Sequence, residues 1–158
     1  MGARGAAPQI LPAREPADFE LVRALFREYA QGVAEPCCFA GFARELDELP
    51  GEYAPPGGVL VLGGGGAGCV ALRRHDAESA EMKRLYVRPA LRGTGLGRAL
   101  ALAAIEAARA AGYRRLVLDT LPKMREAIAL YRALGFRSRG PYSASPTPGA
   151  MFFELTLP

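Results

Sequence analysis

The sequence predicts a single α/β domain whose mixed sheet is covered by helices on both sides. Between residues 80 and 119, strand, helix and strand patterns follow one another within about forty residues, which implies a parallel strand pair joined by a right-handed crossover. Residues 59–72 contain two apolar runs separated by glycines, a pattern typical of antiparallel strands. The 158 residues, half of them hydrophobic and 23% charged, suit one compact core, so we expect residues 1–158 to form one domain.

The first fifty residues are predicted to form one short strand and two helices. Residues 1–7 are small and polar and are expected to be a flexible tail, followed by a strand at 9–13. Apolar side chains then recur every three or four residues from 18 to 30, as on one face of an amphipathic helix. A shorter helix is predicted from 42 to 49, before a Pro-Gly pair, and the segment 32–39 is expected to be the loop between the helices.

A hairpin and a third strand are predicted next. The runs 59–62 and 69–72 are expected to be paired strands. The glycine-rich turn between them is not interpreted as a phosphate loop, because no helical pattern and no Lys-Ser/Thr pair follow it; a flexible hairpin tip fits better. The third strand is expected from 80 to 87, and the pre-proline residue Arg88 keeps the chain extended after it.

The second half alternates helix and strand. From 96 to 111 nearly every residue is a good helix former, and a glycine follows where a C-cap is expected. A buried strand is predicted at 115–119, and a helix from 122 to 135 opens with proline and ends with glycine. Two last strands, around Phe136 and from 150 to 157, are expected to complete the sheet.

Composition disfavours several classes of protein. The net charge of +4 and the twenty basic residues, eighteen of them arginine, form no dense basic stripe with interleaved aromatics, so we expect no nucleic-acid partner. Cys37, Cys38 and Cys69 are odd in number and lack metal-ligand spacing, which predicts reduced thiols of a cytoplasmic protein, with no metal site. No run approaches the ~18 apolar residues of a membrane span, and no signal peptide is visible, so neither export nor a membrane is expected.

The turn at residues 92–97 carries the strongest functional signal in the chain. A strand leads into Arg92-Gly93-Thr94-Gly95-Leu96-Gly97, and an alanine-rich helix follows. Backbone N–H groups at a helix start lack partners, the helix dipole adds positive charge and glycine lets an anion approach closely, so the turn suits a pyrophosphate. It is neither a dinucleotide fingerprint, whose third glycine would fall at Arg98, nor a Walker loop. On this evidence alone a purely structural turn is equally compatible.

Two motifs make residues 80–136 resemble the GNAT acetyltransferase superfamily. Its members carry a strand ending in Leu-x-Val and then Arg/Gln-x-x-Gly-x-Gly/Ala, which are similar to Leu85-Tyr86-Val87 and residues 92–97 here. After the next strand they place a helix with Ala-x-x-Leu-Tyr-x-x-Leu-Gly-Phe, matched by residues 127–136. The helix at 18–30 also looks like the family's first helix. The resemblance implies a GNAT-like mixed sheet whose central parallel strands splay apart.

The same resemblance implies acetyl-CoA as the cofactor. In similar proteins this turn holds the CoA pyrophosphate, which here would involve Arg92, Gly93, Gly95, Leu96, Gly97 and Arg98. The pantetheine arm would lie along Leu85, Tyr86 and Val87, and the N–H of Val87 would polarise the thioester carbonyl. Many relatives also bind pantetheine through an asparagine where this chain has Met124, so another group such as Lys123 or Arg125 would supply that contact.

Two residues match catalytic positions of the family. Direct transfer needs a neutral amine, and an amine with a pKa of ~10.4 is mostly protonated at pH 7, so a general base is expected. Glu81 matches the position where some members place a catalytic glutamate, acting directly or through water; the alternative is a carboxylate paired with Lys83 or Arg84. Tyr131 matches the general acid that protonates the departing thiolate in many relatives, and the alternative is plain core packing.

The acceptor site is expected where the first helix, the loop after it and the last hairpin frame the cleft. Tyr29, Phe39 and Tyr142 are candidates to line it, although aromatic side chains in these places also serve packing. Asp119, at the end of the second parallel strand, would meet an acceptor cation or instead cap the following helix. Relatives often pair through their last strands, so a homodimer is compatible with the resemblance.

These expectations describe an acetyl-CoA-dependent N-acetyltransferase that moves an acetyl group by direct attack to the amine of a small molecule. A small acceptor is favoured because no peptide-groove signature is visible. The alternative is a CoA-binding regulatory or interaction module without turnover. A covalent intermediate on Cys37 or Cys38 is disfavoured, since no histidine partner can be named and the family chemistry is direct transfer.

Overall fold

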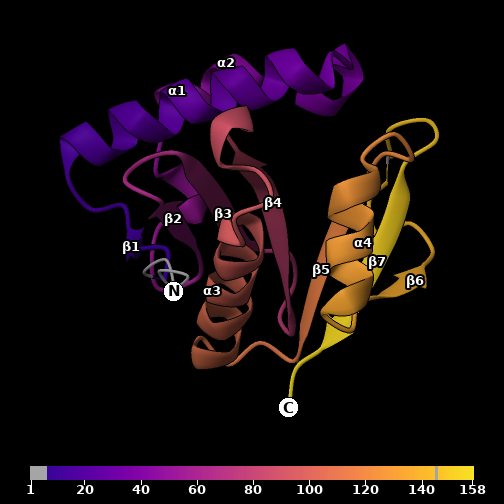
Figure 1. Cartoon of the computed structure of the whole chain (residues 1–158). Helices are drawn as coiled ribbons and strands as arrows, with labels where there is room; N and C mark the ends of the chain where they lie inside the picture. The colour runs from indigo at the N-terminus through magenta and orange to yellow at the C-terminus, as the bar shows by residue number, and fades with distance from the viewer. Residues whose placement is uncertain (1–6, 145) are drawn as a thin grey trace, which may run out of the picture.

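The computed structural model describes residues 7–144 and 146–158, which form a seven-stranded mixed sheet with helices on both faces (Figure 1). The strands follow the order β1-β2-β3-β4-β5-β7-β6. Their bounds are Ile10–Pro12 (β1), Val59–Gly63 (β2), Gly68–Arg74 (β3), Ser79–Val87 (β4), Arg115–Thr120 (β5), Arg137–Arg139 (β6) and Met151–Thr156 (β7). Residues 1–6 of the expected tail lie outside the described residues.

The predicted parallel pair at the centre of the sheet is confirmed. Strands β4 and β5 run parallel, whereas the pairs β1–β2, β2–β3, β3–β4, β5–β7 and β6–β7 are antiparallel. The parallel register covers only Ser79↔Arg115 to Glu81↔Val117, although β4 continues to Val87. The two strands therefore diverge beyond Glu81, as the resemblance implied.

Helices cover both faces of the sheet, as predicted. Their bounds are Pro16–Val33 (α1), Phe42–Asp47 (α2), Leu96–Ala110 (α3) and Arg125–Ala133 (α4). In Figure 1, α3 stands in front of β3 and β4, α4 stands in front of β5 and β7, and α1 crosses above the strands. Short 3₁₀ turns lie at Pro36–Phe39, Gly51–Tyr53 and Pro89–Leu91.

The side chains of β2 and β3 divide the core into two clusters. On one face, strand residues pack with α3 and α4; they include Val61, Val70 and Leu72. On the other face, strand residues pack with α1 and α2; they include Leu60, Leu62, Cys69 and Ala71. Successive strand side chains point to opposite faces, so strands that are buried on both sides need continuous apolar runs. This requirement explains the sequences 59–62 and 69–72.

Helix α1 is longer than the predicted segment 18–30. Pro16 opens it, and the Asp18 carboxylate accepts hydrogen bonds from the backbone N–H groups of Arg14 at 2.9 Å and Glu15 at 3.0 Å, which lower the pKa of Asp18. At the other end Ala34 closes the helix in the left-handed region, with φ 54°. The periodic pattern marks only the buried face, so it missed the polar first turn and the last turn.

Two further boundaries differ from the prediction. Helix α2 ends at Asp47 rather than at residue 49, while Leu49 stays buried against the core without being helical. Helix α4 begins at Arg125 rather than at residue 122, because the N–H of Met124 donates to the Leu121 carbonyl and forms a separate turn. The predicted order of helices and strands is otherwise confirmed.

Candidate active site

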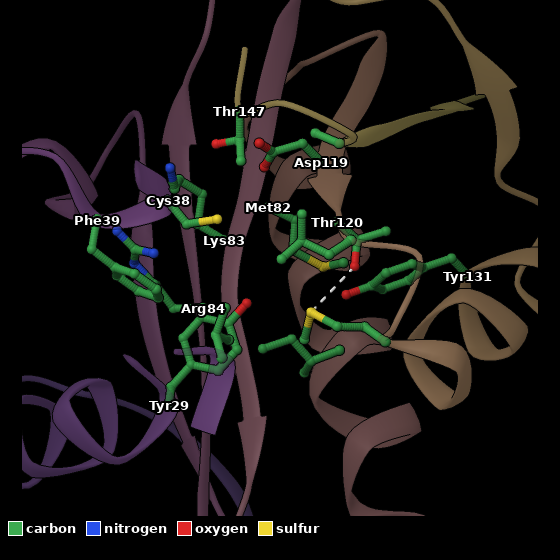
Figure 2. Close-up of a pocket in the computed structure, with 15 residues that line it drawn as sticks. Tyr29, Cys38, Phe39, Met82, Lys83, Arg84, Asp119, Thr120, Tyr131 and Thr147 are labelled. Carbon is green, nitrogen blue, oxygen red and sulfur yellow. Dashed lines mark hydrogen bonds between the residues drawn. The ribbon is translucent and has the colours of Figure 1, made fainter. Parts of the chain in front are cut away.

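A groove opens where β4 and β5 diverge. Its volume is about 640 Å³, and it is lined by the end of β4, the glycine turn and the start of α4. A smaller pocket of about 60 Å³ lies beside it, deeper in the sheet (Figure 2). Both spaces are lined by Tyr29, Val33, Leu85 and Met124. A molecule lying in the groove along β4 can therefore reach the pocket with one end.

A β-bulge shapes the wall of the pocket. In the β3–β4 register Ala71 faces Lys83 but Cys69 faces Tyr86, so β4 has one residue more than β3 between these pairs. Arg84 takes up the difference with φ 60°, an uncommon conformation for a residue other than glycine. Its guanidinium donates to the Glu45 carboxylate at 2.9 and 3.0 Å, which fixes the side chain. Sequence reasoning missed this bulge, since no residue in β4 signals it.

The edge of β4 that faces the groove carries backbone groups that are not paired with another strand. The N–H of Arg88 donates to the Ala67 carbonyl at 2.8 Å, on the β3 side. Backbone groups of successive strand residues point to opposite edges, so the N–H and C=O of Val87 face the groove. The Arg92 side chain donates from Nε to the Val87 carbonyl at 3.1 Å. An extended amide-bearing chain could pair with this edge in place of a strand.

The predicted glycine turn forms an uncapped helix start at the mouth of the groove. Gly93 and Gly95 have φ values of 78° and 90°, which favour glycine, and an added Cβ at either would meet nothing within 4 Å. Gly95 is the N-cap of α3 and provides no side-chain hydrogen bond, and the Thr94 hydroxyl donates to the Leu91 carbonyl instead. The first N–H groups of α3 are therefore available to an anion.

Of the other predicted cofactor residues, most line the groove, whereas Leu96 and Arg98 do not. Arg92, Gly93 and Gly97 line the groove, as do Leu85, Tyr86 and Val87. The side chain of Leu96 is buried in the core, so only its backbone can face an anion. Arg98 is exposed on α3 and is not among the residues that line the groove.

Tyr131 places its hydroxyl at the pocket. Figure 2 shows the hydroxyl turned toward the pocket from α4, and the ring packs against Phe136 and Phe153 with centroid distances of 5.7 and 6.4 Å. Burial raises the pKa of Tyr131, so it stays protonated near neutral pH. Among the described residues, none forms a hydrogen bond with this hydroxyl. The side chain thus packs in the core and still presents a free donor.

Glu81 is not among the residues that line the pocket. Its carboxylate accepts hydrogen bonds from Arg73 at 2.8 Å and from the Tyr142 hydroxyl at 2.6 Å. Burial alone would raise the pKa of Glu81, but the charges of Lys83 and Arg73 and these hydrogen bonds leave it lowered. Arg73, which the sequence did not suggest, is the salt-bridge partner in place of Lys83 or Arg84. Tyr142 is accordingly turned onto Glu81.

Lys83 and Asp119 line the pocket from its two diverging walls (Figure 2). Burial lowers the pKa of Lys83, and burial raises the pKa of Asp119, which stays accessible to solvent at the mouth of the pocket. Asp119 does not cap α4, whose N-cap is Met124. Sequence reasoning considered Lys83 only as a partner of Glu81 and missed its place in the pocket.

Tyr29 and Phe39, the other two acceptor candidates from the sequence, also line the pocket. They contact each other edge-on, with ring centroids 5.9 Å apart. Burial raises the pKa of Tyr29 to about 12. Cys38, in the loop that joins α1 to α2, also lines the pocket.

The region around Met124 differs from the expectation for pantetheine binding. The sulfur of Met124 accepts a hydrogen bond from the Thr120 hydroxyl at 3.5 Å. Lys123 donates from Nζ to the Val33 carbonyl and to Glu35, so it links the loop before α4 to the end of α1. Arg125 lines the groove and is the remaining candidate for that contact.

A sheet whose central parallel strands diverge around a groove, with an uncapped glycine turn at one end, is the arrangement that the sequence resemblance implies for an acyl-CoA-dependent acyltransferase. Residues 19–136 match the model of the Acetyltransferase (GNAT) family, and the chain belongs to this family. It is 34% identical over 147 residues to an uncharacterized N-acetyltransferase of Schizosaccharomyces pombe, and the aligned region covers 90% of each chain. The protein is therefore an N-acetyltransferase with acetyl-CoA as its cofactor.

Solved structures agree with this fold. An acetyltransferase of Streptococcus agalactiae matches with a TM-score of 0.79 at 20% identity, covering 95% of this chain and 98% of the other. The acetyltransferase yncA of Salmonella typhimurium, solved with acetyl-CoA, matches with a TM-score of 0.70 at 18% identity, covering 97% and 95%. In the described part of the chain, no helix is long and apolar enough to cross a membrane, and no cluster of His, Cys, Asp and Glu could hold a metal ion.

Proposed function

We propose that the protein acetylates the amine of a small molecule by direct attack within a ternary complex. The observation that carries this proposal is the pocket of about 60 Å³ that adjoins the groove and is lined by both Asp119 and Tyr131. An apolar cavity of ~150 Å³ can hold benzene, so this smaller space, lined in part by charged and hydroxyl groups, suits a short polar group. Acetyl-CoA supplies the activated acetyl group when bound.

In this proposal the chain holds its cofactor through backbone groups and Arg92. The N–H groups at the start of α3 receive the diphosphate, and the free edge of β4 pairs with the pantetheine amides. The N–H of Val87 lies on that edge and is the donor we assign to the thioester carbonyl. Arg92 must leave the Val87 carbonyl to reach the diphosphate, so cofactor binding exchanges one hydrogen bond of Arg92 for a charge-assisted one.

Tyr131 is the proton donor to the departing sulfur in this proposal. Its hydroxyl faces the pocket, is protonated at neutral pH and has no hydrogen-bond partner among the residues described. An acceptor ammonium loses two protons overall: one ends on the CoA sulfur and the other is released to solvent. Tyr131 delivers the first, and a carboxylate near the amine takes the second.

Asp119 is the carboxylate that we assign to the acceptor amine. It lines the pocket and has a raised pKa, whereas Glu81 does not line the pocket, has both carboxylate oxygens hydrogen-bonded and has a lowered pKa. A low pKa makes a weak proton acceptor at pH 7. Glu81 then acts as a positioning residue that holds Arg73 and Tyr142. The hypothesis from sequence, that Glu81 is itself the base, predicts the opposite ranking of variants.

Steady-state release of CoA across a panel of small amines tests the proposal. We expect release that depends on the amine, with Asp119→Asn losing more kcat/KM than Glu81→Gln. Acetyl-CoA binding without acceptor-dependent release would favour the alternative, a CoA-binding module without turnover, which the relatives named as N-acetyltransferases do not favour. A larger loss in Glu81→Gln, with a folded protein, would return the role of base to Glu81.

A further inference from the structure

Six charged side chains lie near the point where β4 and β5 diverge, and four of them form two ion pairs. Glu81 is paired with Arg73 at 2.8 Å. Arg84 is paired with Glu45 from α2 at 2.9 Å, and its guanidinium also lies over the Phe39 ring at 4.7 Å. These pairs satisfy their own charges, so they offer little attraction to a substrate.

Lys83 and Asp119 remain. Neither makes a hydrogen bond or salt bridge with another residue in the ranges 7–144 and 146–158, and they are too far apart to form a salt bridge with each other. Each nevertheless feels the charge of the other across the pocket. Buried or half-buried charges normally find partners, so a positive and a negative group left facing one small space need a ligand that carries both signs.

We infer that the acceptor is a small amino acid type of zwitterion, whose carboxylate binds Lys83 and whose amine meets Asp119. This inference rests on the proposed function, because it specifies the acceptor of the same site. A simple amine would satisfy Asp119 and leave Lys83 without a counter-charge. A dicarboxylate would satisfy Lys83 and leave Asp119 without a counter-charge. An amine and a carboxylate on adjacent carbons complement both walls of the pocket.

The surroundings of the two charges suit this ligand. Thr147, in the loop before β7, lines the same pocket and provides a further polar group for the acceptor (Figure 2). Tyr131 and Leu85 lie on the side of the pocket toward the groove. An amine held by Asp119 therefore attacks toward the groove, where the N–C bond forms and the C–S bond breaks, while Lys83 holds the carboxylate away from the reacting carbon.

The decisive experiment compares each amino acid with its decarboxylated amine and its carboxamide as acceptors, at saturating acetyl-CoA. A hydrogen bond to a charged group predicts a preference of about 10- to 100-fold in kcat/KM for the amino acid. Lys83→Met should abolish that preference, and Lys83→Arg should retain much of it. Arg74→Met removes a positive charge that lies over the Tyr113 ring, outside the pocket, and should leave the preference intact.

Outcomes separate this inference from the proposed function. If the decarboxylated amines are acetylated as well as the amino acids, the zwitterion inference is wrong and the small-amine function stands. If no acceptor drives CoA release, the small-amine function fails. Calorimetric titration of N-acetyl amino acids into the protein–CoA complex then decides the inference separately. Binding that depends on the carboxylate and is lost in Lys83→Met supports it, and absence of such binding overturns it.

Discussion

At the scale of single residues, Tyr131 shows how one side chain serves both packing and chemistry. Its ring contributes to the core, while its hydroxyl has no hydrogen-bond partner in the described chain and faces the pocket. Tyr131→Phe should therefore lower kcat by about 100-fold, the usual effect of losing a general acid, with little change in stability or CoA affinity. Steady-state kinetics measure the change in kcat, and chemical denaturation measures the change in stability.

The matched control for that variant is Tyr113→Phe. The Tyr113 hydroxyl donates to the Gly57 carbonyl at 2.7 Å, away from the pocket, so its loss should cost about 1 kcal/mol of stability without changing kcat. The two variants thus predict opposite patterns in activity and stability. A fully active Tyr131→Phe would remove the proposed acid.

For Glu81 we expect a stability that depends on pH, because its carboxylate is hydrogen-bonded in the folded state. Its pKa is lowered from the ordinary value of 4.5, so the carboxylate adds stability above that pH, and this stability is lost as the pH falls through the folded-state pKa. Glu81→Gln should cost about 1–3 kcal/mol at pH 7. The difference from the wild type should shrink below pH 4.5. Denaturation curves between pH 3 and 7 measure it, and a difference independent of pH would contradict the assignment.

At the scale of elements, two helix ends have a residue in the left-handed region, but one of these residues is glycine and the other is alanine. Gly95 starts α3 with φ 90°, and Ala34 ends α1 with φ 54°. Gly95→Ala should cost about 1–2 kcal/mol, and Ala34→Gly should gain about 0.5–1 kcal/mol, since only glycine adopts this region without strain. Thermal melts of both variants measure the signs. Changes in Tm of the same sign in both variants would show that the left-handed φ does not determine the stability of these helix ends.

Most elements could be predicted from sequence because their signals are local. Strand runs, the helix former stretch of α3 and the glycine turn each occupy a few consecutive residues, and the structure confirms them. The bulge at Arg84 could not be predicted, since it arises from the mismatch between β3 and β4 and from the Glu45 carboxylate on another element. The start of α1 was missed because its capping uses polar residues outside the apolar pattern, and its end was missed because an alanine, Ala34, closes the helix where glycine is usual.

The site divides in the same way. The turn that contains Gly93 and Gly97 was predicted from the spacing of its glycines, and both residues line the groove. Residues brought together from distant segments were not predicted in this way. Lys83 enters the pocket because the bulge follows it and β5 diverges, and Arg73 meets Glu81 only across the β3–β4 pair. The partners of charged side chains depend on such long-range register, which one sequence does not display.

At the scale of the whole molecule, the diverging strands leave two half-sheets joined along a short seam. Strands β1–β4 lie on one side of this seam and strands β5–β7 on the other, and the parallel pairing that joins them covers only 79–81 against 115–117. Helix α3 also bridges the halves, because it belongs to the same core cluster as residues of β5, α4 and β7. Lys123 adds a link between the halves, from the loop before α4 to the end of α1. A ligand in the groove contacts both halves and should act as a further link.

This architecture predicts that CoA stabilises the fold and that Arg92 carries part of the effect. At a CoA concentration 100 times the Kd, binding adds about 2.7 kcal/mol, which for a domain of this size raises Tm by about 5–10 °C. Arg92→Glu removes a charge-assisted hydrogen bond and places a negative charge beside the diphosphate, so the Kd should rise about 10- to 100-fold. The same CoA concentration should then raise Tm by only about 1–6 °C. Arg109→Glu makes an equal change of charge at the far end of α3, where Arg109 pairs with Glu106, and should keep the full shift. Equal shifts in both variants would mean that general electrostatic attraction, and not a contact at the glycine turn, holds the diphosphate.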